Sequence, residues 1–368
     1  MPTSWIDEYT PLHVRNLDVY QPGKPIEELE RELGISGAIK VASNENPLGP
    51  SPKALAALPG ALPQLNLYPD AGGFALRRVL AARLGVEVAE IALGNGSNDM
   101  LYQLVLATCD PSDEVLTHKC AFLSYRLSAQ VAGRPFIAAP TTPDLACDVD
   151  ALIAAITPRT KLVVLGTPNN PTGSVLSRAD ADRIVAALPP RALLVIDEAY
   201  GEYAARWPEI DHADGLAMSR KDRRVVVLRT FSKIYGLAGL RIGYAIGDRA
   251  VLELLGRVGR TFHVSSLAQV GAMAAIADTD HVDASAKLSR QMIEKMRAEI
   301  NARVYPSLAN FALVDCGRAS TPVYDKLLRA GVIVRPMAAW GLPNHIRVSV
   351  AKEPEMVRVI AAINEVLG

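Results

Sequence analysis

The chain has 368 residues, with 39 basic and 39 acidic side chains and therefore a formal net charge of zero. Hydrophobic residues make up 49% and charged residues 21%, a globular composition that excludes disordered, collagenous and coiled-coil chains. Because there is no basic excess, we expect no binding to nucleic acid or to an acidic membrane surface. At about 150 residues per domain, the length predicts two or three domains.

Cysteine, histidine and hydropathy patterns narrow the class of protein further. The cysteines show no CxxC spacing, and a chain of this length needs no disulfides to bury a core, so we expect a reduced, cytoplasmic protein. The first residues include acids and no signal-peptide core, and no apolar run approaches the roughly 18–20 residues of a membrane span. The histidines have no metal-ligand spacing, so we expect no metal.

The first 50 residues contain several prolines and little regular pattern. We interpret residues 1–50 as an N-terminal arm that joins the smaller domain and contacts a second subunit. The short apolar runs that follow are typical of strands buried on both faces of a parallel sheet, and helical patterns lie between them. This alternation predicts an α/β large domain over residues 51–258. The predicted strands are residues 90–93, 161–165, 192–196, 225–228 and 242–246, and the clearest helices are residues 99–108 and 178–188.

Beyond residue 261 the pattern changes to helices with a few short strands. This mixture predicts a smaller α+β domain over residues 259–368. Its predicted elements are helices over residues 267–297 and 354–367 and strands at residues 312–315, 332–334 and 346–350.

Polar residues follow the predicted strands at their carboxyl ends, where ligands bind in open parallel sheets. The glycine-bearing turn at residues 94–98 leads into a helix whose N terminus is a ready anion site, although a simple tight turn explains it equally well. Residues 166–173 form a turn rich in asparagine and proline, for which a structural role is the plainer interpretation.

Two charged residues follow the next two strands. Asp197 ends a buried strand, where a carboxylate is costly unless a cation or donors meet it, and a helix cap is the alternative. Lys233 has hydroxyls before it and Arg241 eight residues later, and taken alone it is more simply a solvated surface lysine. Together, these strand ends are what pyridoxal 5′-phosphate requires. A lysine amine forms a Schiff base with its aldehyde, a carboxylate keeps its ring nitrogen protonated, and the turn, serine and arginine hold its phosphate.

Three segments carry a family resemblance: NNPTG at residues 169–173, DEAY at 197–200 and TFSKIYGLAGLRIGY at 230–244. In this order and spacing they resemble the fold-type I pyridoxal-phosphate aminotransferases of class II. The resemblance covers about residues 20–350 and implies an α/β fold with a mostly parallel sheet in a large domain and a smaller α+β domain. The segments most similar to the histidinol-phosphate aminotransferases are YQPGKP (20–25), ASNENPLGPSPKA (42–54), YPDAGGFALR (68–77) and VIVRPM (332–337).

The resemblance implies a role for each matching residue. Lys233 would carry the Schiff base and move the proton, and Asp197 would pair with the ring nitrogen. Tyr200 and Asn170 would donate hydrogen bonds to the phenolic oxygen of the cofactor, and Phe122 would stack on its ring. The cofactor phosphate would be bound by Gly96, Ser97, Asn98, Ser232 and Arg241, with Tyr68 reaching it from a second subunit. The substrate would be bound by Asn46, Arg335, Arg347 and, from the second subunit, Tyr20.

The implied activity is a ping-pong transamination between L-histidinol phosphate and 2-oxoglutarate, a step of histidine biosynthesis, in a homodimer with shared active sites. Histidinol phosphate has a phosphate where an amino acid has its α-carboxylate. Two arginines hold a phosphate better than one, so Arg335 beside Arg347 favours this substrate. Outside the family context, surface ion pairs would explain both arginines.

Some residues depart from the family pattern. The stretch TFHVSS at residues 261–266 stands where this branch more often has FNVN, which puts His263 and Ser265 in place of asparagines. Ala351 replaces a usual glycine, and Phe122 replaces the commoner tyrosine. Because His263 either has a structural role or marks a changed substrate, an aromatic amino-acid (Phe/Tyr) aminotransferase stays open as the alternative. A non-enzymatic regulator that senses pyridoxal phosphate is not expected, because such proteins carry a DNA-binding domain and a basic surface.

Overall fold

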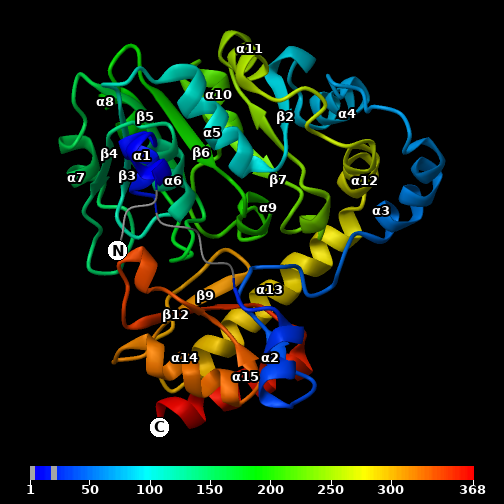
Figure 1. The fold of residues 1–368 in the computed structure, drawn as a ribbon, viewed down its shortest axis with the longest axis vertical. Helices are drawn as coiled ribbons and strands as arrows, with labels where there is room; N and C mark the ends of the chain where they lie inside the picture. Colours follow the sequence, from blue (N-terminus) through cyan, green and yellow to red (C-terminus); the bar gives the residue numbers. More distant parts are fainter. Residues whose placement is uncertain (1–4, 18–22) are drawn as a thin grey trace.

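The computed structural model describes residues 5–17 and 23–368. Figure 1 shows two packed units, a larger one around a seven-stranded sheet and a smaller one that carries the C terminus. The sheet has the strand order β2-β8-β7-β6-β5-β3-β4, in which β8 is antiparallel to both neighbours and all other pairs are parallel. The predicted mostly parallel α/β sheet is therefore confirmed. Its strands are β2 (Ile91–Gly94), β3 (Glu114–His118), β4 (Phe136–Ala139), β5 (Thr160–Gly166), β6 (Leu193–Asp197), β7 (Val225–Thr230) and β8 (Gly243–Ile246).

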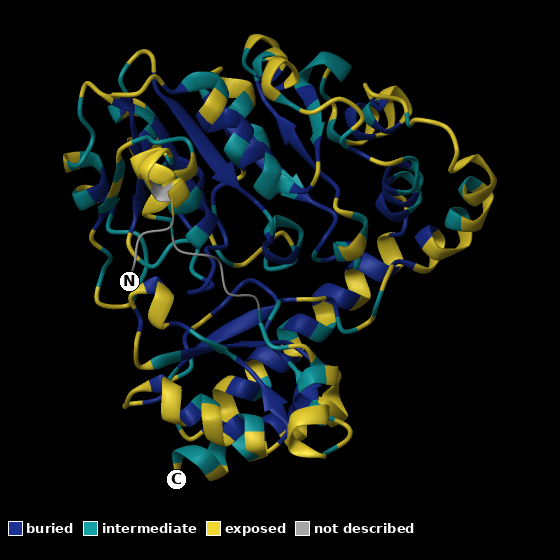
Figure 2. Cartoon of the chain, in the orientation of Figure 1, coloured by how far each residue is buried: buried dark blue, intermediate teal, exposed yellow. Residues whose placement is uncertain are grey.

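Helices bury both faces of this sheet, and alternate residues along each strand point to opposite faces. Leu194 and Ile196 of β6 pack in the core that α4, α8 and α12 share, whereas Leu193 and Val195 pack in the core of α5, α6 and α11. The central strands are accordingly buried in Figure 2, which explains why their sequences are continuously apolar. The helices are α3 (Pro52–Ala57), α4 (Phe74–Leu84), α5 (Ser97–Thr108), α6 (Leu123–Val131), α7 (Val149–Ala154), α8 (Arg178–Ala187), α9 (Gly201–Ala204), α10 (Gly215–Lys221), α11 (Arg249–Val258) and α12 (Ser266–Ile276).

The smaller unit contains an antiparallel sheet of order β11-β12-β9 and a parallel pair of β1 with β10. Through β1, part of the predicted N-terminal arm belongs to this unit, whereas α1 contacts α6 of the larger one. The elements are α1 (Leu12–Arg15), α2 (Ile26–Leu33), β1 (Ile39–Lys40), α13 (Thr279–Glu299), β9 (Phe311–Asp315), α14 (Ser320–Arg329), β10 (Val332–Ile333), β11 (Arg335–Pro336), β12 (His345–Ser349) and α15 (Glu353–Leu367).

Helix α13 connects the two units. It has 21 residues and is therefore about 31 Å long. Val282 in its first half packs in the core of the larger unit, and Met296 in its second half packs in the core of the smaller one. The predicted domain division at residues 258 and 259 precedes α12, yet Ala268 of α12 packs in the core of the larger unit. By its packing, the chain therefore crosses from the larger unit to the smaller one within α13.

Two further features concern the described part of the chain. Among those residues, no helix combines the length and the apolar character that crossing a bilayer requires. Nor do three or more His, Cys, Asp or Glu side chains within residues 5–17 and 23–368 converge as metal ligands.

A substitution at Leu194 tests whether the sheet is buried on both faces. Its side chain is fully buried, so Leu194→Ala removes packed apolar volume and should lower the free energy of unfolding by about 2–5 kcal/mol. Val357 of α15 is 48% exposed, and Val357→Ala should change the same quantity by less than about 0.5 kcal/mol. Urea titration followed by circular dichroism measures both. Equal losses in the two variants would contradict the packing described here.

Candidate active site

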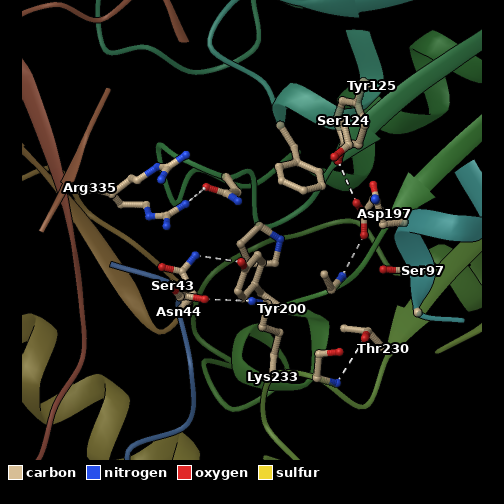
Figure 3. Close-up of a pocket in the computed structure, with 18 of the residues that line it drawn as sticks. Ser43, Asn44, Ser97, Ser124, Tyr125, Asp197, Tyr200, Thr230, Lys233 and Arg335 are labelled. Carbon is tan, nitrogen blue, oxygen red and sulfur yellow. Dashed lines mark hydrogen bonds between the residues drawn. The ribbon is translucent and has the colours of Figure 1, made fainter. Parts of the chain in front are cut away.

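A cavity of about 460 Å³ lies where the carboxyl ends of β5, β6 and β7 face the smaller unit. Figure 3 shows side chains of both units pointing into it. The larger unit contributes Asp197 and Lys233, and the smaller unit contributes Arg335, Arg347 and Trp340. The site residues predicted from the sequence that line it are Gly96, Ser97, Asn98, Phe122, Asn170, Asp197, Tyr200, Ser232, Lys233, Arg241, Arg335 and Arg347.

Asp197 ends β6 and is only 6% exposed. Its two oxygens accept hydrogen bonds from the Tyr125 hydroxyl at 2.9 Å and from the Ala199 backbone N–H at 3.1 Å (Figure 3). Burial raises the pKa of Asp197 to about 6, although these two hydrogen bonds act in the opposite direction. A cationic group in the cavity would restore the ionised carboxylate, because an opposite charge favours the charged form.

Lys233 lies three residues after β7, and its Nζ donates a hydrogen bond to the Ser43 carbonyl at 3.3 Å. Burial, together with the nearby Arg347 guanidinium, lowers the pKa of Lys233 to about 8. A substantial fraction of the amine is therefore neutral near pH 7.5, which an amine needs in order to act as a nucleophile or a base.

Tyr200 and Asn170 lie on either side of this pair of charges. Tyr200 is buried, its ring meets Phe311 edge-on at 5.1 Å, and its hydroxyl oxygen accepts a hydrogen bond from Asn44 Nδ2 at 2.8 Å. The Asn170 oxygen accepts from Arg347 Nη1 at 2.6 Å. The NH2 end of Asn170 is therefore the end that can donate to an acceptor in the cavity.

An anion cradle forms at the N terminus of α5. Its N-cap, Gly96, has φ +83° and no side-chain cap, so the first backbone N–H groups of the helix face the cavity side. A Cβ on Gly96 would lie 2.9 Å from Arg241 Nη2 and would displace this guanidinium, and the positive φ itself favours glycine. Arg241 Nη1 lies 3.5 Å from the Ser232 hydroxyl, to which it donates. Backbone N–H groups, a hydroxyl and a guanidinium together form a phosphate-binding set of donors.

The two predicted substrate arginines occupy one wall. Arg335 of β11 and Arg347 of β12 are direct partners in the antiparallel register, so their side chains project from the same face of the sheet. Arg347 is 5% exposed, and its Nη2 donates to the Ala42 carbonyl at 2.6 Å. The Arg335 guanidinium lies 5.4 Å from the centre of the Trp340 ring. Two guanidinium groups thus face one cavity.

Two predicted residues are not brought to this cavity, and a third is not among the described residues. Asn46 is buried elsewhere, where its NH2 donates to the Ile234 carbonyl at 2.7 Å and to the Ser285 hydroxyl at 2.9 Å. Tyr68 is 81% exposed and stacks on Phe262 at 4.5 Å. Tyr20 lies outside the described residues. The predicted roles of Tyr20 and Tyr68 concern a second subunit and stay predictions.

The cavity also contains residues that the sequence reading did not select. Asn44 is two residues before Asn46 in the same segment, and Tyr125 follows Phe122 by three residues, which is the helical spacing that places both on one side of α6. The rings of Phe122 and Tyr125 meet edge-on at 5.7 Å. That spacing is the signal that identifies Tyr125 as a cavity residue.

Two of the departures from the family pattern, His263 and Ser265, have structural roles. The His263 ring nitrogens contact backbone carbonyls, Nδ1 with Arg260 at 2.6 Å and Nε2 with Leu93 at 3.1 Å. The Ser265 hydroxyl caps α12 by accepting from the Ala268 N–H at 3.2 Å. Neither residue lines the cavity.

Comparisons with known proteins agree with this geometry. The sequence pattern of the family "Aminotransferase class I and II" matches residues 36–363. The chain is 44% identical over 362 residues to a histidinol-phosphate aminotransferase of Anaeromyxobacter sp. (strain Fw109-5), covering 97% of this chain and 99% of that one. It is 43% identical over 357 residues to histidinol-phosphate aminotransferase 1 of Nitrosococcus oceani, covering 96% and 95%. The fold is similar to the crystal structure of a histidinol-phosphate aminotransferase from Sinorhizobium meliloti in complex with pyridoxal 5′-phosphate, with a TM-score of 0.86, 31% identity and 97% of both chains covered.

The buried carboxyl predicts a pH-dependent gain in stability for Asp197→Asn. The folded pKa of about 6 lies above the unfolded value near 3.9, so the ligand-free wild type loses stability as the pH rises between these values. The variant lacks this loss and should be more stable than wild type at pH 7 by about 1–3 kcal/mol, with the difference shrinking below about pH 4. Urea unfolding at both pH values measures it. A difference that is independent of pH would refute the raised pKa.

Proposed function

Since the chain belongs to the aminotransferase class I and II family, we propose that it is a pyridoxal 5′-phosphate-dependent transaminase acting between L-histidinol phosphate and 2-oxoglutarate. The observation that carries the substrate is the register pairing of Arg335 with Arg347 on one wall of the cavity. The names of the relatives at 44% and 43% identity support the same substrate. The reaction then belongs to histidine biosynthesis.

The chemistry of the residues at the site fits the cofactor. Asp197 is a buried carboxyl whose raised pKa a ring cation would reverse, and it ends the central strand β6. The cradle at the start of α5 offers backbone N–H donors to a phosphate. Lys233 places a partly neutral amine in the same cavity.

When bound, pyridoxal 5′-phosphate supplies an aldehyde that bonds covalently to an amine and a ring that accepts an electron pair. Lys233 Nζ is the amine that this chain offers to the aldehyde, and when it is free its lone pair would serve as the base for the substrate α-proton. Asp197 would hold positive charge at the ring nitrogen. Tyr200 and Asn170 would donate toward the phenolic oxygen, and Phe122, which lines the same cavity, would cover the ring.

Arg347 is positioned to serve both half-reactions. Asn170 and the Ala42 carbonyl fix its guanidinium in a buried position, so little conformational entropy is lost when an anion binds. A carboxylate of 2-oxoglutarate needs one such fork, whereas the phosphate of histidinol phosphate carries more charge and more acceptor oxygens. Arg335 supplies the second set of donors that distinguishes the two anions.

The assembly we propose is a homodimer in the cytoplasm. The larger unit exposes six large apolar side chains between residues 55 and 74, in and after α3 at the outer edge in Figure 1, and gathered exposed apolar side chains mark protein interfaces. A second copy is the occupant that the predicted role of Tyr68 requires. The four cysteines are unpaired, which supports a reducing compartment. The exposed apolar residues are Leu55, Leu62, Leu65, Leu67, Tyr68 and Phe74.

The aromatic amino-acid aminotransferase is not retained as a second candidate. It was suggested by departures from the family pattern at His263, Ser265, Ala351 and Phe122. The side chains of His263 and Ser265 contact backbone groups outside the cavity, so they give no reason to infer a changed substrate. Ala351 does not line the cavity either, and Phe122 is assigned to the cofactor ring.

Lys233→Ala should abolish transamination, because general base catalysis alone contributes about 10²–10⁴-fold and the covalent bond to the protein is also lost. Initial rates with histidinol phosphate and 2-oxoglutarate measure this. Lys326→Ala, at an exposed position of α14, is the matched control and should keep wild-type rates. Full activity of Lys233→Ala would refute the proposed chemistry.

Arg335→Gln should lower kcat/KM for histidinol phosphate by about 10–100-fold, the cost of losing a charge-assisted hydrogen bond. The reduction should be several-fold smaller with phenylalanine as the amino donor, because a single carboxylate needs only Arg347. Arg335→Lys keeps the charge without the fork and should fall between. Equal losses for both donors would show that Arg335 does not recognise the phosphate.

A further inference from the structure

We propose that Asn44 is a positioning residue that fixes the direction in which the Tyr200 hydroxyl donates its proton, and that it thereby couples Tyr200 to the smaller unit. The inference rests on the proposed function, because it treats Tyr200 as a donor to the cofactor. The family resemblance implies a substrate-binding role for Asn46 in the same segment. In the structure, Asn44 is the asparagine of this segment that lines the cavity.

The backbone at Asn44 restricts which residues can stand there. Its φ is +54°, in the left-handed region that asparagine and glycine tolerate best. The side chain is only 1% exposed, so an amide there must satisfy both of its ends within the protein. Glycine would satisfy the backbone but not supply the amide. The conformation thus favours asparagine among residues that can form hydrogen bonds at this position.

The smaller unit holds the oxygen end of Asn44. The Asn44 backbone N–H donates to the Ser349 hydroxyl at 2.8 Å, and that hydroxyl donates back to Asn44 Oδ1 at 2.8 Å. Asn310 Nδ2 donates to the Asn44 carbonyl at 3.1 Å. Ser349 ends β12, two residues after Arg347, and Asn310 directly precedes β9. These bonds fix the amide so that its NH2 faces the larger unit.

The NH2 end then determines the role of Tyr200. Asn44 Nδ2 donates to the Tyr200 hydroxyl oxygen at 2.8 Å (Figure 3). An amide NH2 cannot accept a hydrogen bond, so the tyrosine oxygen is the acceptor here and its own proton is directed to a different group. Donation into the hydroxyl oxygen also polarises its O–H bond and strengthens it as a donor.

The same segment contacts the other reactive groups. The Ser43 carbonyl accepts from Lys233 Nζ at 3.3 Å, and the Ala42 carbonyl accepts from Arg347 Nη2 at 2.6 Å. Three consecutive residues therefore contact the amine, the substrate arginine and the tyrosine. A movement of the smaller unit that shifts this segment reaches Tyr200 through Asn44.

The test follows the visible absorbance of the protein loaded with pyridoxal 5′-phosphate as a function of pH. A strong donor to the phenolic oxygen stabilises the negative charge on that oxygen. The oxygen then attracts less strongly the proton that it shares with the nitrogen bonded to the cofactor, and the pH at which this proton is lost falls. Asn44→Gly keeps the backbone conformation and removes the amide, so the titration midpoint should rise by about 0.2–0.7 pH unit. Ser349→Ala releases the oxygen end of the amide and should shift the midpoint in the same direction by less.

Asn44→Asp is the more informative variant, because it keeps the shape of the side chain and reverses the direction of its hydrogen bond with the Tyr200 hydroxyl. A carboxylate at this position accepts from the Tyr200 hydroxyl and draws its proton away from the cofactor, so the midpoint should rise more than in Asn44→Gly. Asn364→Asp is the matched control, since Asn364 also bridges two segments of the smaller unit, far from the cavity. The charged groups that line the cavity, Asp197, Lys233, Arg241, Arg335 and Arg347, and Glu45 near Lys233, are unchanged in Asn44→Gly and Ser349→Ala, whereas Asn44→Asp adds a carboxylate to them.

A double-mutant cycle distinguishes positioning from mere packing. In a Tyr200→Phe background, Asn44→Gly should cause no further shift, because the path through the hydroxyl is already lost. The same shift in both backgrounds, or an unchanged midpoint in Asn44→Gly with intact circular dichroism, would overturn the inference. If wild type itself shows no pH-dependent absorbance that Lys233→Ala removes, the proposed function fails, and the inference fails with it.

Discussion

Burial of the central sheet on both faces is the constraint on which the rest of this structure depends. A strand covered from both sides excludes unpaired charges along its length, because each would have to be desolvated. Polar chemistry is therefore confined to the strand ends. In a parallel sheet, neighbouring carboxyl ends lie at the same edge, so Asn170, Asp197 and Lys233 meet although they are separated by up to 63 positions in the numbering. The apolar core thus selects the place of the active site.

The active site also needs a second wall, which the central sheet does not supply. The smaller unit provides it through β11 and β12, and residues 42–44 join that wall to the strand ends. Helix α13 fixes the two units together by packing in both cores. Burial also shifts the pKa values of the two reactive groups. It raises the pKa of Asp197, which a positively charged ring would reverse, and it lowers the pKa of Lys233, which leaves part of the amine neutral and reactive.

Much of this could be predicted from the sequence because the residues concerned obey local rules. Continuous apolar runs identified β5 to β8, and the polar residues after them identified the site. Strands β3 and β4 were not predicted. The sequence of β3 contains two polar residues that are buried, Glu114 and His118. Arg159, 45 positions away, pairs with Glu114, and the carbonyl of the neighbouring Lys119 contacts the His118 ring. Polar residues buried in this way interrupt the apolar run by which a buried strand is recognised.

The residues that escaped prediction share one property, which is that their roles are set by neighbours distant in sequence. Asn44 acts through Tyr200 and Ser349, which are separated from it by 156 and 305 positions. Asn46 carries the same side chain in the same segment, yet it faces Ile234 and Ser285. Nothing within the segment distinguishes the two asparagines. The motif resemblance located the segment, and only the fold determined which amide reaches the cavity.

The most direct test of the account is a single-turnover titration of the cofactor-loaded enzyme. The absorbance change on amino transfer is followed with L-histidinol phosphate and, separately, with phenylalanine and tyrosine. We expect conversion by histidinol phosphate at concentrations about 100-fold lower than either aromatic amino acid requires, because the phosphate engages both arginines. Conversion by phenylalanine or tyrosine at equal or lower concentrations would contradict the two-arginine phosphate site.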